Sequence, residues 1–320
     1  MSKVSLFILR VVLIHGFIIF QWSCKPQVVS RRTKPIPSGD ATNNTKDGVN
    51  KTPPSPNPDV GTNTAPVASC AGQVLGIVDG KRVAESSLIS RSTGQLWLED
   101  SDCTATLIGP RHMLTAAHCL ADANPIEVRF GLKPDSAKTV IPVAKWVIHP
   151  LYNDREIPHD IAIFTLENEV PSELVPVPLA NPEDLQIGTD IIITGYGTAS
   201  EKSENSQPLS MVLVPLEEVN AADRYFSTVI NGKASCYGDS GGPGYIVDKQ
   251  TQCLKAVGVV SIASINGNGK CGEGDTMMDA TRYKGWIAAS FEQLGAPLSG
   301  LPKDGSELDA TQNRVKSVKN

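Results

Sequence analysis

The sequence predicts an all-β fold, a sandwich or a barrel, for the part of the chain that follows Cys70. Short apolar runs rich in β-branched residues recur between turn residues; examples are GQLWL, CTATLI, TVIPVAKWVI, DIAIFTL, DIIITGYG and AVGVVSIA. Their length and composition fit strands better than helices. Only the stretch from Tyr283 to Leu294 has apolar residues at helical spacing, so we expect a helix there.

Composition and charge exclude several classes of function. The chain has 320 residues, of which 40% are hydrophobic and 20% charged, enough for a substantial core in one or two domains. The formal net charge is -5 and no basic block alternates with aromatic residues, so nothing favours nucleic-acid binding. The histidines are scattered and no CxxC or HExxH spacing occurs, so we expect neither a metal nor a cofactor.

The N-terminus has the layout of an export signal. A short basic region precedes the apolar run from Val11 to Phe20, which is too short to span a membrane as a helix. A membrane anchor is the alternative interpretation. Cys24 follows a small residue at the end of this region and resembles the lipidation site of a bacterial lipoprotein, so we expect residues 1–24 to be a signal peptide with a candidate membrane tether at Cys24.

The cysteine count and the next segment agree with export. The chain has seven cysteines, and lipidation of Cys24 would leave an even number for disulfides in an oxidising compartment. Residues 25–76 are rich in Pro, Thr, Ser, Asn and Lys, and such a segment buries too little apolar surface to offset its ordering entropy. We expect a disordered linker or propeptide there, and a mobile polar tail over residues 296–320.

Three segments carry residues suited to acyl transfer. CYGDSGGP places Ser240 beside glycines whose backbone N–H groups can approach a substrate closely, TAAHC contains His118, and DIAIFTL begins with Asp160. Taken singly, each has a plainer explanation as a Gly-rich turn, a core or loop histidine, or a strand-capping acid. Jointly they supply a nucleophile, its base and an acid that orients the base.

Chain order separates the classes of serine hydrolase. An α/β-hydrolase has its histidine after the nucleophile, and no histidine follows His159. The subtilisin order needs the acid before His118, and the all-β pattern disagrees with that fold. The remaining order is His118, Asp160, Ser240.

Residues from about Ile77 to Leu294 resemble a chymotrypsin-family, trypsin-like serine protease of a bacterial, exported type. The motifs that carry the resemblance are CTATLIGPRHMLTAAHC, WVIHPLYN, HDIAIFTL, ITGYGT, SCYGDSGGP and VGVVSIA. The resemblance implies two Greek-key six-stranded β-barrels, over residues 77–179 and 180–295, with a C-terminal helix in the second segment. The catalytic site is expected between the barrels.

The resemblance also implies a role for each site residue. Ser240 would attack the scissile carbonyl, His118 would take its proton and return it to the leaving amine, and Asp160 would orient His118. The oxyanion hole would consist of the backbone N–H groups of Gly238 and Ser240. Each of these roles is an expectation carried over from the family.

Substrate recognition follows in the same way. The substrate backbone would pair as an added strand with three residues, Ser261, Ile262 and Ala263, and Ser261 would also support the acid of the triad. Relatives that cleave after Arg or Lys carry Asp six residues before the nucleophile, where this chain has Ala234. Because side chains at Ala263 and Thr276 would narrow the pocket, we expect small or medium apolar residues before the scissile bond.

Three disulfides and an activation switch complete the expectations. The resemblance implies two disulfides and elimination leaves the third; the pairs are Cys103–Cys119, Cys236–Cys271 and Cys70–Cys253. IVDGKRV, from Ile77, resembles the family's mature N-terminus, whose free amine pairs with the acid beside the nucleophile, here Asp239. Gly76 precedes Ile77 where many relatives have Arg or Lys, which argues against activation of this zymogen by a trypsin-like enzyme.

The sequence therefore predicts a monomeric serine endopeptidase that acts on proteins or peptides, either secreted or held at a membrane through Cys24. A catalytically silent binding or adhesion module on the same fold is the alternative, since a fold does not fix an activity. The enzyme is favoured because all three triad residues are present. Esterase activity cannot be separated from peptidase activity, because the same groups cleave both bonds.

Overall fold

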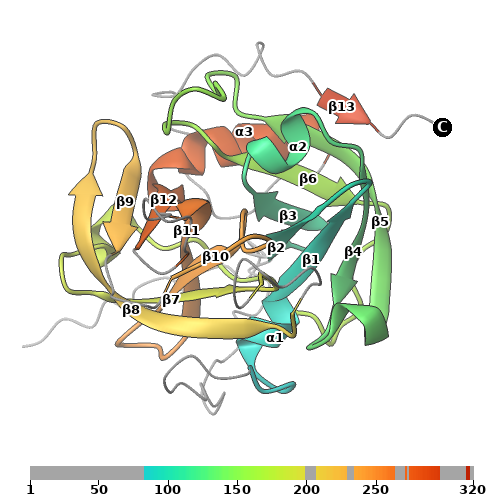
Figure 1. Cartoon of the computed structure of the whole chain (residues 1–320), viewed down its shortest axis with the longest axis horizontal. Helices are drawn as coiled ribbons and strands as arrows, with labels where there is room; N and C mark the ends of the chain where they lie inside the picture. Colours follow the sequence, from blue (N-terminus) through green and yellow to red (C-terminus); the bar gives the residue numbers. More distant parts are fainter. Residues whose placement is uncertain are drawn as a thin grey trace, which may run out of the picture. The chain divides into compact units, whose positions relative to one another are not determined.

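The computed structural model describes residues 83–198, 207–228, 234–263, 271, 274–295 and 315–317. They belong to the compact unit Thr64–Asn320. The elements, drawn in Figure 1, are α1 (Leu88–Ser92), β1 (Thr93–Leu98), β2 (Asp102–Gly109), β3 (His112–Thr115), α2 (His118–Ala121), β4 (Pro125–Phe130), η1 (Pro134–Ser136), β5 (Thr139–Ile148), β6 (Ala162–Leu166), η2 (Pro182–Asp184), β7 (Asp190–Gly195), β8 (Ser210–Asn220), β9 (Tyr225–Thr228), β10 (Pro243–Val247), β11 (Leu254–Ala263), β12 (Asp275–Asp279), η3 (Ala280–Tyr283), α3 (Lys284–Gln293) and β13 (Val315–Ser317).

Strands β1 to β6 form the first barrel. They are antiparallel in the order β5-β4-β1-β2-β3-β6, and pairing of β5 with β6 closes the ring. Strand β5 allows this closure because it changes partner along its length: Thr139 to Pro142 pair with β4, and Val143 to Ile148 pair with β6. Proline has no N–H to donate to a ladder, which suits Pro142 to the point of exchange.

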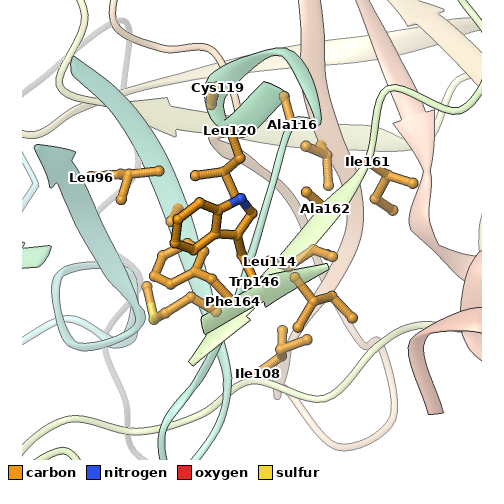
Figure 2. Packing of buried hydrophobic residues seen from close by; sticks show 14 of the residues in the cluster. Leu96, Ile108, Leu114, Ala116, Cys119, Leu120, Trp146, Ile161, Ala162 and Phe164 are labelled. Atoms are coloured by element: carbon orange, nitrogen blue, oxygen red, sulfur yellow. The ribbon is translucent and has the colours of Figure 1, made fainter. Parts of the chain in front are cut away.

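The core of the first barrel explains the continuous apolar runs in the sequence. Strand β6 is buried along its whole length, as is typical of a strand covered on both faces. Trp146 is 4% exposed and lies in the same buried cluster as Leu120 and Phe164, as Figure 2 shows. Because Leu120 belongs to α2, this cluster also fixes the short helix that begins at His118.

Strands β7 to β12 form the second barrel. Its strand order is β10-β11-β12-β9-β8-β7, and the pairing of β10 with β7, at Gly244 and Ile193, closes it. Its core contains buried residues from every strand of the barrel: Ile191, Ile193, Val214, Leu216, Phe226, Ile246, Val257, Val260 and Met277. The two barrels are therefore separately closed sheets, and Val259 and Met278 of the second barrel also lie in the buried cluster of the first.

The C-terminal helix joins the end of the second barrel to the first. Trp286, Ile287 and Phe291 of α3 lie in the buried cluster of the first barrel, and the Phe291 ring stacks on His112 with a centroid distance of 4.0 Å. The predicted fold class of two closed six-stranded antiparallel barrels with a C-terminal helix is confirmed. The segment boundaries assigned from the sequence stay predictions. No helix among the described residues is long and apolar enough to cross a membrane.

The polar tail contributes a strand that the sequence did not predict. Residues 315–317 form β13, which pairs antiparallel with β5 from Lys145 to Val147, as Figure 1 shows. Lys316 also donates from Nζ to the carbonyl of Ala121 at the end of α2, at 3.0 Å. All three residues are exposed, so backbone pairing accounts for a strand that has no apolar pattern.

Candidate active site

His118 begins the short helix α2, directly after β3. A disulfide joins Cys119 of this helix to Cys103 of β2, with a Cα–Cα distance of 6.3 Å. On the other side, Leu120 is completely buried in the core of the first barrel. The position of His118 is therefore fixed by a covalent bond and by packing, while its own side chain keeps 36% of its surface exposed.

Asp160 holds His118 through two hydrogen bonds. Its Oδ1 accepts from the backbone N–H of His118 at 2.8 Å, and its Oδ2 lies 2.7 Å from His118 Nδ1. The carboxylate is 4% exposed and stands just before β6. An acceptor at this distance assigns the proton of a neutral imidazole to Nδ1, which leaves Nε2 as the basic nitrogen.

The second barrel supplies a third hydrogen bond to this carboxylate. Ser261, near the end of β11, donates from Oγ to Asp160 Oδ2 at 2.6 Å. The carboxylate thus accepts bonds from α2 and from β11, elements that belong to the two different barrels. The three groups meet where the barrels face each other.

The loop before β10 brings Ser240 to the same place. The carbonyl of Ser240 accepts from the N–H of Thr104 at 2.8 Å, and Gly241 donates to the carbonyl of Val260 at 2.8 Å. Gly241 has φ +76°, and a Cβ on it would lie 2.0 Å from the Thr115 hydroxyl oxygen. Only glycine fits at this close approach to the segment that leads into His118.

The hydroxyl of Ser240 makes no hydrogen bond to the imidazole of His118 within the described residues. Catalytic hydrogen bonds are often long or poorly aligned without substrate and tighten only in the reacting complex. The hydrogen bonds of the structure join His118 to Asp160 directly, and Gly241 brings the nucleophile loop close to Thr115, three residues before His118.

Gly238 and Ser240 carry backbone N–H groups for which no acceptor occurs among the described residues. Gly238 has φ +93°, and a Cβ on it would lie 3.1 Å from the Cα of Gly197, so glycine is required at this turn as well. The Thr104 hydroxyl donates to the Gly238 carbonyl at 2.8 Å and holds the turn from behind. Two neighbouring free donors beside a serine are the components of an oxyanion hole.

Asp239 turns inward between these two residues. Its Oδ1 accepts from the N–H of Gly197 at 2.8 Å and its Oδ2 accepts from the N–H of Cys236 at 2.9 Å. Desolvation raises the pKa of the Asp239 carboxyl to about 6 even though both hydrogen bonds favour the charged form. Its expected partner, Ile77, lies outside the described residues.

The expected pocket wall needs one correction. In the register of β11 and β12, Ala263 pairs with Asp275, whereas Thr276 pairs with Ile262. Successive side chains on a strand point to opposite faces, so Thr276 faces away from the side that Asp275 occupies. Asp275 contacts the nucleophile loop, because the N–H of Ser235 donates to its Oδ1 at 2.9 Å. The residue that pairs with Ala263 is therefore Asp275 and not Thr276.

The cysteines follow the expected pattern as far as they are described. Cys103–Cys119 and Cys236–Cys271 are both present, and Cys236–Cys271 has a Cα–Cα distance of 5.4 Å. Cys253 is also disulfide-bonded. Cys24 and Cys70 lie outside the described residues, as does Gly76, so the pairing of Cys70 with Cys253 stays a prediction.

The one group of candidate metal ligands found among the described residues does not form a metal site. Ligand atoms of Cys103, His118 and Cys119 lie within 4.8 Å of one another. The two sulfur atoms are bonded to each other, so neither is a thiolate that can bind a metal.

Sequence reasoning missed a histidine pair behind the acid. His149 is 2% exposed, and its ring stacks on that of His159 at a centroid distance of 4.5 Å. His159 directly precedes Asp160 and has φ 70°. Its Nδ1 lies 3.1 Å from the hydroxyl oxygen of Tyr283. Burial lowers the pKa of His149 to about 3, so this ring stays neutral near neutral pH. In the sequence, Pro150 follows His149 and Asp160 follows His159, and neither neighbour indicates that the two rings stack.

Two closed barrels, with a histidine held by a buried acid beside a glycine-flanked serine, define the class of double-barrel serine endopeptidases. A comparison with protein families agrees: the family model described as Trypsin matches residues 77–287. The chain belongs to the trypsin family and is a serine endopeptidase.

Individual relatives support the same assignment. The chain is 30% identical over 210 residues to kallikrein-8 of Rattus norvegicus, covering 58% of this chain and 75% of that protein. It is 31% identical over 183 residues to a trypsin of Phaedon cochleariae, covering 50% of this chain and 67% of that one. The solved structure of neuropsin, a serine protease expressed in the limbic system of mouse brain, matches with a TM-score of 0.54 and 26% identity, covering 66% of this chain and 98% of that chain. These relatives are eukaryotic and give no support to the expected bacterial source.

Proposed function

We propose that the chain hydrolyses peptide bonds through an acyl-enzyme on Ser240, with His118 as general base and acid. The observation that carries this proposal is the arrangement around Asp160, whose two oxygens accept three hydrogen bonds, two of them from His118. This arrangement fixes both the orientation and the tautomer of the imidazole. A general base needs its basic nitrogen free and correctly directed before it can take a proton.

The reaction then follows from the atoms at the site. His118 Nε2 takes the proton of the Ser240 hydroxyl while the oxygen attacks the scissile carbonyl, and the positive charge on the ring is stabilised by Asp160 at 2.7 Å. The same proton passes to the leaving amine, which leaves an acyl group on Ser240. Water repeats the cycle and releases the acid product.

The oxyanion of each tetrahedral intermediate would lie at the N–H groups of Gly238 and Ser240. Their freedom from other acceptors among the described residues supports this assignment. Loss of one such donor typically raises the barrier by about 2.7 to 4 kcal/mol. Thr104, which donates to the carbonyls of Gly238 and Ser240, would keep these N–H groups in place.

Activation would depend on Asp239. A free amine at Ile77 would form an ion pair with this buried carboxylate and hold the nucleophile loop, with cleavage after Gly76 as the trigger. The raised pKa of Asp239 favours such a partner, because a cation offsets the desolvation of the carboxylate. The protease that cuts after Gly76 would not be a trypsin-like one.

The cellular context is an exported one. The disulfides within the fold support export, because disulfides persist in oxidising compartments. We further propose that residues 1–24 are a signal peptide, that Cys24 carries the membrane tether, and that the mature protein is a monomer. The expected preference for small or medium apolar residues before the scissile bond relied partly on Thr276, which faces away from the side that Asp275 occupies.

Labelling with a fluorophosphonate probe tests the enzyme against the silent binding module. The wild type should label, and Ser240→Ala and His118→Ala should not. Ser210→Ala is a matched control, because Ser210 is an exposed serine on β8 outside the site, and it should label like the wild type. Failure of the wild type to label after cleavage behind Gly76 would favour the binding module.

A further inference from the structure

His159 has an uncommon backbone conformation directly before the acid of the triad. Its φ is 70°, in the left-handed region that residues with a Cβ rarely adopt. Its carbonyl accepts from the N–H of Ile161 at 2.8 Å, so Asp160 is the central residue of a three-residue turn. The direction in which the Asp160 side chain leaves the backbone therefore depends on this turn.

Two buried aromatic residues hold the ring of His159. The ring of His149 lies nearly parallel to it, with a centroid distance of 4.5 Å and an interplanar angle of 4°. The hydroxyl oxygen of Tyr283 lies 3.1 Å from His159 Nδ1, and these two rings meet at 83°. His149 is 2% exposed and Tyr283 is completely buried, so both partners are themselves fixed by packing.

His149 contacts both neighbours of the acid. While its ring stacks on His159, its backbone N–H donates to the carbonyl of Ile161 at 3.1 Å. The His149 ring also lies 5.0 Å from that of Trp286 on α3. Burial lowers the pKa of both histidines, that of His149 to about 3, so the stacked rings are neutral near neutral pH and do not repel each other.

The hydrogen bonds to the Asp160 carboxylate do not account for the turn. They hold the two oxygens, whereas His159 and Ile161 define the backbone from which the side chain starts. A residue in the left-handed region persists there only where its surroundings impose that conformation. Here the surroundings are His149, which follows β5, and Tyr283, the last residue of η3.

We propose that His159 is a positioning residue for Asp160. Its ring, held by His149 and Tyr283, imposes the left-handed turn that directs the carboxylate toward His118. Because a misplacement of about 1 Å can lower a rate by about 100-fold, this turn controls the rate of the chemical step and leaves substrate binding unchanged. This inference rests on the proposed function, since it concerns the same triad.

The first experiment compares two variants at position 159 of the matured full-length protein. His159→Ala and His159→Asn both remove the ring, but asparagine tolerates the left-handed conformation better than alanine. On a peptide amide, His159→Ala should lower kcat by about 10- to 100-fold and keep KM within about twofold of the wild type. His159→Asn should recover most of this loss. Wild-type kcat in His159→Ala, or an equal loss in both variants, would overturn the proposal.

His112→Ala is the matched control. His112 is 1% exposed and its ring stacks on Phe291 at 4.0 Å, so this variant also removes a stacked histidine from the first barrel. His112 is not adjacent to any residue of the triad. Its variant should keep the wild-type kcat when rates are measured below the unfolding temperature of each protein. A loss of kcat as large as that of His159→Ala would assign the effect to packing and contradict the proposal.

The second experiment tests the stack. His149→Ala removes the ring beside His159 and should lower kcat by about 10- to 100-fold, whereas His149→Phe keeps a flat ring there and should stay within about fivefold of the wild type. Because both histidines act through one contact, the double variant His149→Ala/His159→Ala should lose little more than either single variant. Losses that multiply in the double variant would count against a shared contact and against the proposal.

Proton NMR in a Ser240→Ala background tests the positioning without turnover. The His118 Nδ1 proton, held by Asp160 at 2.7 Å, is expected at low field and is assigned by its loss in His118→Ala. His159→Ala should shift or broaden this resonance, and His112→Ala should leave it unchanged. An unchanged resonance in His159→Ala would refute this inference and keep the proposed function. Failure of the wild type to label with a fluorophosphonate, with the resonance responding as expected, would refute only the proposed function.

A milder variant covers the case in which His159→Ala does not fold. Tyr283→Phe keeps the ring and removes only the hydroxyl beside His159 Nδ1. It should lower kcat by about 2- to 10-fold, as expected for loss of one neutral hydrogen bond. Unchanged kcat and an unchanged low-field resonance in Tyr283→Phe would then overturn the proposal.

Discussion

Replacing Ser261 by alanine should slow catalysis with little change in substrate binding. Ser261 is 6% exposed, and its hydroxyl donates to Asp160 Oδ2, the oxygen that also holds His118 Nδ1. The variant removes one of three hydrogen bonds to the carboxylate and leaves both bonds to His118. A hydrogen bond to a charged group contributes about 1.5 to 3 kcal/mol, so kcat should fall by about 10- to 150-fold.

The assay measures initial rates on one peptide amide, divided by the concentration of labelled active sites. KM should stay close to that of the wild type, because the backbone of β11 is unchanged. Ser290→Ala is the matched control, since Ser290 is a completely buried serine on α3 whose hydroxyl has no partner among the described residues. Full kcat in Ser261→Ala, or an equal loss in both variants, would contradict this role of the Ser261 hydroxyl.

Two further predictions concern stability. Replacing Cys103 and Cys119 together by alanine should lower the free energy of unfolding by about 3 kcal/mol, because the bond spans 16 residues; an unchanged urea midpoint would contradict this. The second concerns His149, whose folded pKa of about 3 lies below the 6.5 of an ordinary histidine, so the unfolded chain binds more protons between these values. The stability due to the neutral ring is thus fully present above pH 6.5 and is lost as the pH falls toward 3. Between pH 6.5 and about pH 5 the wild type should lose about 2 kcal/mol more than His149→Phe in urea titrations, and parallel losses would argue against the assignment.

Most strands could be predicted from the sequence because their burial leaves a local trace. The runs that became β5, β6 and β11 are apolar and β-branched, and the helical spacing from Tyr283 to Leu294 marks α3. No predicted run corresponds to β3, β9 or β12. These strands are short, and β12 begins and ends with an aspartate, so the alternation expected of a half-buried strand is not visible in them.

The tail strand β13 was missed for a different reason. It is held by backbone pairing to β5 and its side chains are all exposed. An extended segment can pair through its backbone N–H and C=O groups with the open edge of a strand, whatever its side chains are. The sequence of such a segment need not carry a pattern. Its location depends on which strand edge the rest of the fold leaves open.

The residues of the candidate site also differ in how far the sequence predicts them. His118, Asp160 and Ser240 could be proposed from the sequence, because a base, an acid and a nucleophile in this chain order separate one class of serine hydrolase from the others. The position of Asp275 could not, because it depends on strand register. A shift of one residue between β11 and β12 decides whether Thr276 or Asp275 pairs with Ala263, and spacing in the sequence does not fix it. The contact between Ser235 and Asp275 joins residues that lie 40 positions apart.

The most direct test of acyl transfer at Ser240 is capture of the covalent intermediate. A slowly deacylating ester is mixed with the matured protein, the reaction is stopped with acid, and the protein is analysed by intact-mass measurement and peptide mapping. We expect one acyl group per active site, on the peptide that contains Ser240, and none in Ser240→Ala or His118→Ala. Acylation of another residue, or peptide cleavage that continues in Ser240→Ala, would contradict it.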